Sequence, residues 1–568
     1  MQLFLDGQPV EAHAGESLLT LCKRLSLCSK PLSELPLAAR MAGETFSLNF
    51  IPLRADGAGN EAPRRAVRLC KGQISLLRYG GDRGFRVYER SLLFLYICAV
   101  RRVFPGVRIH VDYALGPTLH TSLLRDAPLT DADIRAIEAE MRALVSKNLP
   151  LIRTRLDIDE AIDYFTRDGQ TDKVEMLQWR NSNYFDVYWL EDTADYFYGE
   201  MLPTTGFLTQ FSLIRAEDGA ILLLRPTREA PDMLPEWKPM PKFSATMLQT
   251  AEWCELLDCS DICALNEAVR NGSIRSLIRI NEALHEKSFA AIADAIIARG
   301  ARAVLIAGPS SSGKTTSANR LCVQLRVHGK KPILMSLDNY YKNRELCPVD
   351  ENGERDLEHI DAIDCALFRE NLSALLRGES VRPPKFDFKK QKRVEGDSVY
   401  TAEPDTIFVI EGIHGLNPAL LPDDIDRSLV YRMYVSALTT VNLDDHNRIP
   451  TTNLRLLRRI VRDYATRGAS VATTLSMWQS VRRGEDRWIF PYQEEADVIF
   501  NSSLVYEPSI LKRQIYPLLL AERPTGRYYE EVRSLVKFLN YVFEADVADE
   551  IPPTSILREF IGGNSFYR

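Results

Sequence analysis

The sequence predicts an α/β fold in the C-terminal half of the chain, with a parallel sheet and helices on both of its faces. Three observations lead to this prediction. Short apolar runs of strand type lie at 302–307, 332–337 and 407–412. An amphipathic helical pattern at 316–328 follows the first run. The third run is almost entirely apolar, as expected of a strand that is buried on both faces.

The first strand leads into a loop that fits the pattern G-x-x-x-x-G-K-[ST]. A strand that turns tightly into a helix N-terminus presents backbone N–H groups to phosphates. In this pattern Lys314 supplies a cation to the β- and γ-phosphates, and the Thr315 hydroxyl can hold Mg²⁺. The alternative is a chance match in a Gly/Ser loop, which the strand and helix on either side make less favourable. The residues predicted to hold a nucleotide are Gly308, Ser310, Ser311, Ser312, Gly313, Lys314, Thr315 and Thr316.

Carboxylates follow the second and third strands. Asp338 comes directly after 332–337, and Glu411 lies near the end of 407–412. In a parallel sheet this end of a strand lines the ligand crevice. Asp338 can there accept a proton from an acceptor hydroxyl or hold Mg²⁺ through water, although a lone carboxylate can also only cap a turn. Glu411 is a candidate metal ligand.

A basic helix is predicted at 453–468. Arg455, Arg459 and Arg462 are spaced i, i+4 and i+7 and share one face, while apolar residues line another. Such a helix can close over a polyphosphate and neutralise the charge of the transition state. The alternative is a solvated face of arginines.

Seven ordered motifs between about 300 and 505 resemble the uridine kinase and phosphoribulokinase-like group of P-loop kinases. The motifs are "GPSSSGKTTSANRL", "SLDNYY", "DLEHIDAIDCALF", "RPPKFDF", "IFVIEGIHGL", "LRRIVRDYATRG" and "EEADVIFNSS". The resemblance implies ATP-dependent phosphoryl transfer to a small-molecule hydroxyl, with ATP and Mg²⁺ as cofactors. It implies that Asp338 is the general base. The other catalytic residues it implies are Lys314, Arg459, Arg462 and Arg467; the metal-site residues are Thr315 and Glu411; the substrate-binding residues are Glu358, Phe386 and Arg393.

The acceptor pocket departs from the nucleoside-kinase pattern at the positions that contact the nucleoside. The aspartate, tyrosine, histidine and glutamine of that family are replaced by Glu358, Phe386, Gln391 and Met477. Because base-edge partners give such pockets much of their specificity, uridine and cytidine are expected to be poor acceptors. Three nearby arginines favour a smaller or more anionic acceptor; they are Arg482, Arg483 and Arg487.

The N-terminal half resembles the front of threonyl-tRNA synthetase. "LFLDGQPVEAHAGESLLTLCKRL" and "AARMAGETFSLNF" resemble a TGS domain, a small β-grasp fold, and "YERSLLFLYICAVRRVFPGVRIHVDYALGP" and "ADYFYGEMLPTTGFLTQF" resemble the editing domain of the synthetase. The four polar positions of the editing site are here occupied by Arg90, Phe94, Phe197 and Met201. These side chains cannot form a zinc or hydrolytic site, so neither zinc nor deacylase activity is expected. A scaffold or regulatory role is favoured over binding of an RNA end or a small ligand.

The composition fits a globular enzyme. The 568 residues are 45% hydrophobic and 26% charged, and the formal net charge is −6, which does not favour nucleic acid as a general partner. The apolar run at 92–100 is too short to span a membrane, no signal-like segment is apparent, and ten scattered cysteines favour a reducing cytoplasm. The C-x4-C-x3-C spacing from Cys254 to Cys263 is not a usual metal pattern. A homo-oligomer is compatible with the sequence, which does not define the oligomeric state.

The predicted domains are a TGS-like domain at 1–60, an editing-like α+β domain at 68–225, a linker and helical segment at 226–299, a P-loop kinase domain at 300–520 and a helical tail at 521–568. Residues 55–60 are predicted to be a linker. The rival function is a nucleotide-dependent regulatory or RNA-binding P-loop ATPase. Asp338 favours the kinase, because a switch needs no base for an acceptor.

Overall fold

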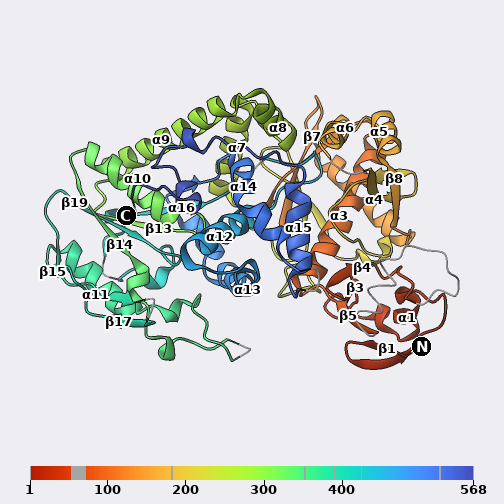
Figure 1. Ribbon diagram of the computed structural model, residues 1–568, viewed down its shortest axis with the longest axis horizontal. Coiled ribbons are helices and arrows are strands. Elements are labelled where there is room, and N and C mark those ends of the chain that lie inside the picture. The colour runs from red at the N-terminus through yellow and green to blue at the C-terminus, as the bar shows by residue number, and fades with distance from the viewer. Residues whose placement is uncertain are drawn as a thin grey trace. The chain divides into compact units, whose positions relative to one another are not determined.

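The chain forms two compact units in a computed structural model (Figure 1). The model describes residues 2–52, 72–180, 183–350, 353–387, 390–423, 425–439, 441–523 and 526–566. Unit 1 consists of Met1–Pro239, Asn442–Arg448 and Glu522–Tyr541. Unit 2 consists of Met240–Val441, Ile449–Ala521 and Val542–Arg568. The predicted linker at 55–60 lies outside the described residues, and the five predicted domain boundaries stay predictions.

Unit 2 contains a five-stranded parallel sheet in the order β14-β19-β13-β20-β21. Its strands are β13 (Ala303–Ala307), β14 (Lys331–Ser336), β19 (Thr406–Glu411), β20 (Val430–Ser436) and β21 (Val498–Asn501). Every residue of β13 and β19 is buried, which explains their apolar sequences. The prediction of a parallel sheet is confirmed, with β19 and β13 at its centre.

Helices cover both faces of this sheet. α11 packs on the face that carries Leu305, Phe408 and Ile410, and Figure 1 shows α9 and α10 on the opposite side. The helices of unit 2 are α7 (Pro241–Leu256), α8 (Ile262–Asn271), α9 (Ile274–Arg299), α10 (Lys314–Val327), α11 (Cys365–Leu376), α12 (Thr451–Arg467), α13 (Val471–Trp488), α14 (Glu507–Leu520) and α16 (Arg558–Ile561). Two small antiparallel pairs join β15 (Ser380–Val381) to β18 (Tyr400–Thr401) and β16 (Lys385–Asp387) to β17 (Lys392–Val394).

The described residues of unit 1 form three sheets, in the orders β2-β1-β5-β3-β4, β10-β9-β8 and β11-β12-β7-β6. Their strands are β1 (Gln2–Leu5), β2 (Gln8–Glu11), β3 (Ala38–Met41), β4 (Glu44–Phe46), β5 (Gln73–Leu77), β6 (Arg108–Leu115), β7 (Thr118–Leu124), β8 (Ile152–Asp157), β9 (Tyr184–Leu190), β10 (Thr193–Asp195), β11 (Ser212–Arg215) and β12 (Ile221–Leu224). The helices described in unit 1 are α1 (Leu18–Arg24), α3 (Asp82–Val103), α4 (Asp131–Ser146), α5 (Ile158–Arg167), α6 (Thr171–Gln178) and α15 (Tyr529–Leu539). The β-grasp and editing-domain resemblances stay predictions.

The core of unit 1 is built around α3. The apolar run at 92–100 lies on this helix and is buried along its whole length. α4 packs beside α3 and begins with a capping box, in which the Thr130 side chain accepts from the Asp133 backbone N–H and Asp133 accepts from the Thr130 N–H. No helix among the described residues has the length and apolar character needed to cross a bilayer.

Residues 442–448, the inserted segment, belong to unit 1 although the chain on both sides belongs to unit 2. Its Asp444 lies 3.2 Å from the Lys173 ammonium of α6, and Asp195 lies 3.2 Å from the same ammonium. All three side chains are completely buried. His446 of the segment also pairs with Asp195, at 2.7 Å. Although burial opposes a charged lysine, Asp195 and Asp444 raise the pKa of Lys173.

A second buried network in unit 1 makes its stability depend on pH. His120 lies between two carboxylates, with Nδ1 2.8 Å from Asp112 and Nε2 2.9 Å from Asp218. Burial favours the neutral ring, but the two carboxylates outweigh it and raise the pKa of His120 to about 9. Because the pKa in the unfolded chain is about 6.5, the protonated ring stabilises the fold by about 3 kcal/mol below that pH. This contribution is lost as the pH rises through 9.

We therefore expect His120→Gln to lower the unfolding temperature most at pH 6, and progressively less toward pH 9.5. Thermal denaturation of both proteins across this range measures the difference between them. A difference that does not change with pH would show that His120 contributes only packing.

Candidate functional site

The predicted phosphate-binding loop joins β13 to α10 with the expected geometry. A side chain at Gly308 would clash with the carbonyl oxygen of Val435, and Gly313 has φ +87°, so both positions require glycine. Gly313 is the N-cap of α10, which begins at Lys314. The hydroxyls of Ser311 and Ser312 are buried and, among the described residues, have no hydrogen-bond partner. These orphaned groups and the helix N-terminus fit the phosphates of a nucleotide.

Lys314 lies beside the two carboxylates that end the neighbouring strands. Its Nζ donates to the Pro309 carbonyl oxygen at 3.1 Å. Burial lowers the pKa of Lys314, while the charges of Glu411, Asp338 and Glu559 oppose this effect. The ammonium is thus balanced by carboxylates where the phosphates of a nucleotide are expected.

Glu411 and Asp338 lie close enough to influence each other. The Ser336 hydroxyl donates to Glu411 at 2.9 Å, because these residues are register partners in β14 and β19. Burial raises the pKa of Glu411 to about 7; Asp338 adds to the shift and Lys314 opposes it. Burial also raises the pKa of Asp338, against the charges of Lys314 and Arg467. The strand ends therefore place one ammonium and two carboxylates in a single site.

The three predicted catalytic arginines of α12, which are Arg459, Arg462 and Arg467, all form ion pairs with one buried carboxylate. The sequence did not predict this carboxylate. Asp463 is completely buried and lies 3.3 Å from Arg459, 2.9 Å from Arg462 and 3.4 Å from Arg467. Arg459 also donates to the Ser310 hydroxyl at 2.8 Å. This helix face therefore lies against the phosphate-binding loop.

Arg455 and Glu485 form a buried pair behind the same loop. Both side chains are at most 1% exposed. Arg455 Nε donates to the Ser310 carbonyl oxygen, and the Ser310 N–H donates to Glu485, each at 3.0 Å. The helical spacing placed Arg455 on the correct face, but no sequence signal linked it to a glutamate 30 residues away. The pair fixes the backbone of the loop at Ser310.

Glu358 is the predicted acceptor residue that lies closest to this chemistry. The side chain is half-buried and contacts α13 so tightly that any side chain at Gly484 would clash with it. Burial and the neighbouring Glu485 carboxylate raise the pKa of Glu358 to about 7, while Arg459 and Lys314 oppose this shift. Glu358 therefore lies within electrostatic reach of the phosphate-binding residues.

The other two predicted acceptor residues face each other on a hairpin. Phe386 of β16 and Arg393 of β17 are register partners. Arg393 forms an ion pair with Asp364 at 2.6 Å, and the Phe386 ring lies 5.8 Å from the Tyr341 ring. The charge of Arg393 is thus already balanced within the protein.

Two of the arginines that favoured an anionic acceptor also have carboxylate partners. Arg482 lies 2.8 Å from Glu485 and 3.3 Å from Asp486. Arg483 lies 3.4 Å from Asp350. These pairs weaken the argument for an anionic acceptor, since their positive charge is compensated.

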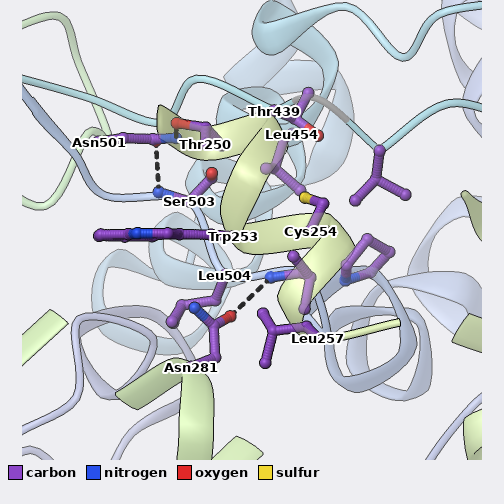
Figure 2. Close-up of a pocket in the computed structure, with 13 residues that line it drawn as sticks. Thr250, Trp253, Cys254, Leu257, Asn281, Thr439, Leu454, Asn501, Ser503 and Leu504 are labelled. Atoms are coloured by element: carbon purple, nitrogen blue, oxygen red, sulfur yellow. Dashed lines mark hydrogen bonds between the residues drawn. The ribbon is translucent and has the colours of Figure 1, made fainter. Parts of the chain in front are cut away.

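Two hollows in the structure are separate from this site. Figure 2 shows a cavity beside Trp253 and Cys254 of α7, with a volume of about 20 Å³, which has room for a single water molecule. It is too small for a substrate. An open hollow of about 520 Å³ in unit 1 is lined in part by Lys23, Lys30 and Phe207.

Three of the four positions that correspond to an editing site, Phe94, Phe197 and Met201, form apolar packing in unit 1. The rings of Phe94 and Phe197 are 5.6 Å apart, and Met201 is completely buried. Arg90 donates to the carbonyl oxygen of Glu200. We therefore expect assays to detect no deacylase activity from these residues.

Comparison with known proteins places the kinase motifs in a family. Residues 303–506 match the model of the Phosphoribulokinase / Uridine kinase family. The uridine kinase of Staphylococcus aureus strain JH9 is 32% identical over 195 residues, which are 34% of this chain and 84% of that protein. D-glycerate 3-kinase from Cryptococcus neoformans has a solved structure that is 16% identical, with a TM-score of 0.22; the match covers 49% of this chain and 89% of that one. The predicted P-loop kinase domain is confirmed by the first two matches, and the resemblances of the N-terminal half stay predictions.

Proposed function

Because the chain belongs to the phosphoribulokinase / uridine kinase family, we propose that it is a kinase that transfers the γ-phosphoryl group of ATP to a hydroxyl of a small molecule. One feature of the site gives the main support for this proposal. Lys314 lies beside Asp338 and Glu411, and on its loop the buried hydroxyls of Ser311 and Ser312 have no hydrogen-bond partner within the described part of the chain. The site therefore combines groups that can bind phosphates, a candidate base and a candidate metal ligand, as phosphoryl transfer requires.

The nucleotide would be held by the phosphate-binding loop and Lys314. Thr315 and Glu411 would hold Mg²⁺, since hydroxyl and carboxylate oxygens are the ligands that this ion prefers. When bound, the ion supplies positive charge to the phosphates. Arg459, Arg462 and Arg467 would stabilise the charge that develops during transfer, and Asp463 keeps their guanidinium groups together.

Asp338 would accept the proton of the acceptor hydroxyl. Its raised pKa makes the carboxylate a better proton acceptor than an ordinary aspartate. Glu358 would bind the acceptor, and its pKa of about 7 lets it either donate or accept a hydrogen bond to a hydroxyl near neutral pH.

The identity of the acceptor is tested by a screen of the purified full-length protein with labelled ATP, Mg²⁺ and a panel of nucleosides, polyols, sugars and sugar acids. We expect a hydroxyl compound other than uridine or cytidine to stimulate turnover most. Transfer to uridine with kcat/KM of about 10⁴ M⁻¹s⁻¹ or more would instead mean that other residues rebuild a base pocket. ATP turnover that no hydroxyl compound stimulates would favour the regulatory or RNA-binding ATPase.

We expect Asp338→Asn to reduce phosphoryl transfer by about a hundredfold or more while ATP affinity changes little, because asparagine keeps the shape but cannot accept the proton. Calorimetric titration with ATP and steady-state turnover measure the two effects separately. If both survive, Asp338 has a structural role. If both are lost together, it acts chiefly in metal binding or folding.

Unit 1 would act as a scaffold or regulatory module in the cytoplasm. The packing of Phe94 against Phe197 supports this proposal, because these side chains offer no metal ligand or hydrolytic group. We expect the full-length protein to bind no stoichiometric zinc and to leave mischarged threonyl-tRNA intact.

A further inference from the structure

The last segment of the chain packs directly against the phosphate-binding loop. The Thr316 hydroxyl donates to the Glu559 carboxylate of α16 at 2.7 Å. The Asn564 amide lies 3.4 Å from the same hydroxyl. A Cβ at Gly313 would lie 2.5 Å from Ile556, so the tail approaches the loop as closely as a glycine allows. All of these residues belong to unit 2.

Glu559 therefore adds a negative charge at the positive end of α10. Thr316 is the third residue of that helix, and the helix N-terminus is the pole that attracts anions. The carboxylate is also within electrostatic reach of Lys314 and Glu411. Thr316 is completely buried, whereas Glu559 is only partly buried. The Glu559 carboxylate therefore lies at the edge of the phosphate-binding loop and is partly open to solvent.

This charge affects the two forms of the nucleotide unequally. Free ATP carries about twice the negative charge of its magnesium complex, so a fixed carboxylate near the phosphates repels the free form more strongly. Magnesium offsets that repulsion, because the cation is attracted by the same carboxylate.

We propose that Glu559 is a specificity-determining residue that makes the nucleotide site select magnesium-complexed ATP over the free polyanion. The proposal rests on the proposed function, since it requires that the loop binds ATP. It assigns to the C-terminal tail a role in nucleotide recognition that the kinase motifs do not include.

The test is Glu559→Gln in the full-length protein. The glutamine oxygen still accepts from the Thr316 hydroxyl, so only the charge is lost. Isothermal titration calorimetry measures the affinity for ATP in EDTA and for ATP with excess Mg²⁺. We expect the affinity for free ATP to rise about five- to tenfold and that for the magnesium complex less than about twofold. Higher salt should reduce the gain.

The matched control is Glu550→Gln, which removes a tail carboxylate that pairs with Arg275 and Arg279 instead. It should leave both affinities unchanged, and the unfolding temperatures of both variants should verify folding. Suppose that the wild-type protein binds ATP, but that Glu559→Gln shows an unchanged or lower affinity for ATP, or an equal gain in affinity for free ATP and the magnesium complex. The inference about Glu559 is then wrong, and the proposed function is unaffected. If wild-type protein binds no ATP, the proposed function fails as well.

Discussion

Lys314→Ala is expected to reduce ATP turnover by about a hundredfold or more while the protein stays folded. Removing one preorganised charged contact to the transferred phosphoryl group typically costs about 3 kcal/mol in the transition state. Lys314 is the first residue of α10, and the carboxylates of Asp338 and Glu411 lie within electrostatic reach of its ammonium. The loss of its charge also leaves these carboxylates to repel the phosphates. Turnover with Mg²⁺ and the best acceptor from the screen is the measurement.

A control for this prediction is Lys330→Ala, which removes a partly exposed lysine just beyond the other end of the same helix. Its turnover should equal that of the wild type. Turnover near the wild-type value in Lys314→Ala would instead remove the basis for assigning the loop to nucleotide binding.

Lys173→Met is expected to destabilise unit 1 by about 3–5 kcal/mol. The substitution keeps the approximate volume but leaves Asp195 and Asp444 buried without their shared cation, and uncompensated buried charge is among the most costly defects in a protein core. Because a protein of two units need not unfold in one step, calorimetry should resolve which transition moves. Hydrogen exchange of α6 and the inserted segment should report the same loss locally.

Lys385→Met tests whether any lost ion pair has this effect. Lys385 pairs with Asp397 at 2.7 Å, but both side chains are more than half exposed. Exposed pairs contribute at most about 1 kcal/mol, so its transition should hardly move. A comparably small shift for Lys173→Met would show that the buried carboxylates take up protons or water at little cost.

Local sequence patterns were sufficient for three strands of the central sheet, β13, β14 and β19, and for the phosphate-binding loop, but they did not predict β20 or β21. The apolar runs at β13 and β19 are buried on both faces, and the glycines at 308 and 313 are required by close packing and by a positive φ. These features depend on residues that are adjacent in the chain. The same holds for the arginines of α12, whose shared face follows from helical spacing.

Local patterns could not predict contacts between residues that lie far apart in the sequence. The segment "LDDHNR" falls inside the predicted kinase domain at 300–520, where it resembles an extra loop before the basic helix, yet these residues complete a polar core in unit 1. Glu485 and Glu559 likewise act on the loop from positions 170 residues or more away along the chain. A carboxylate with such a role has the same local sequence context as a solvated one, so only the folded structure identifies it.

The path of the chain through unit 1 has a consequence for biosynthesis. A ribosome that has made the first 239 residues has not yet made Asp444, His446 or α15, and the last of these follows about 300 residues later. At typical translation rates this interval is on the order of half a minute. During that time the nascent chain holds Lys173 with an incomplete set of partners. Unit 1 must therefore reach its final form late, after most of unit 2 has been synthesised.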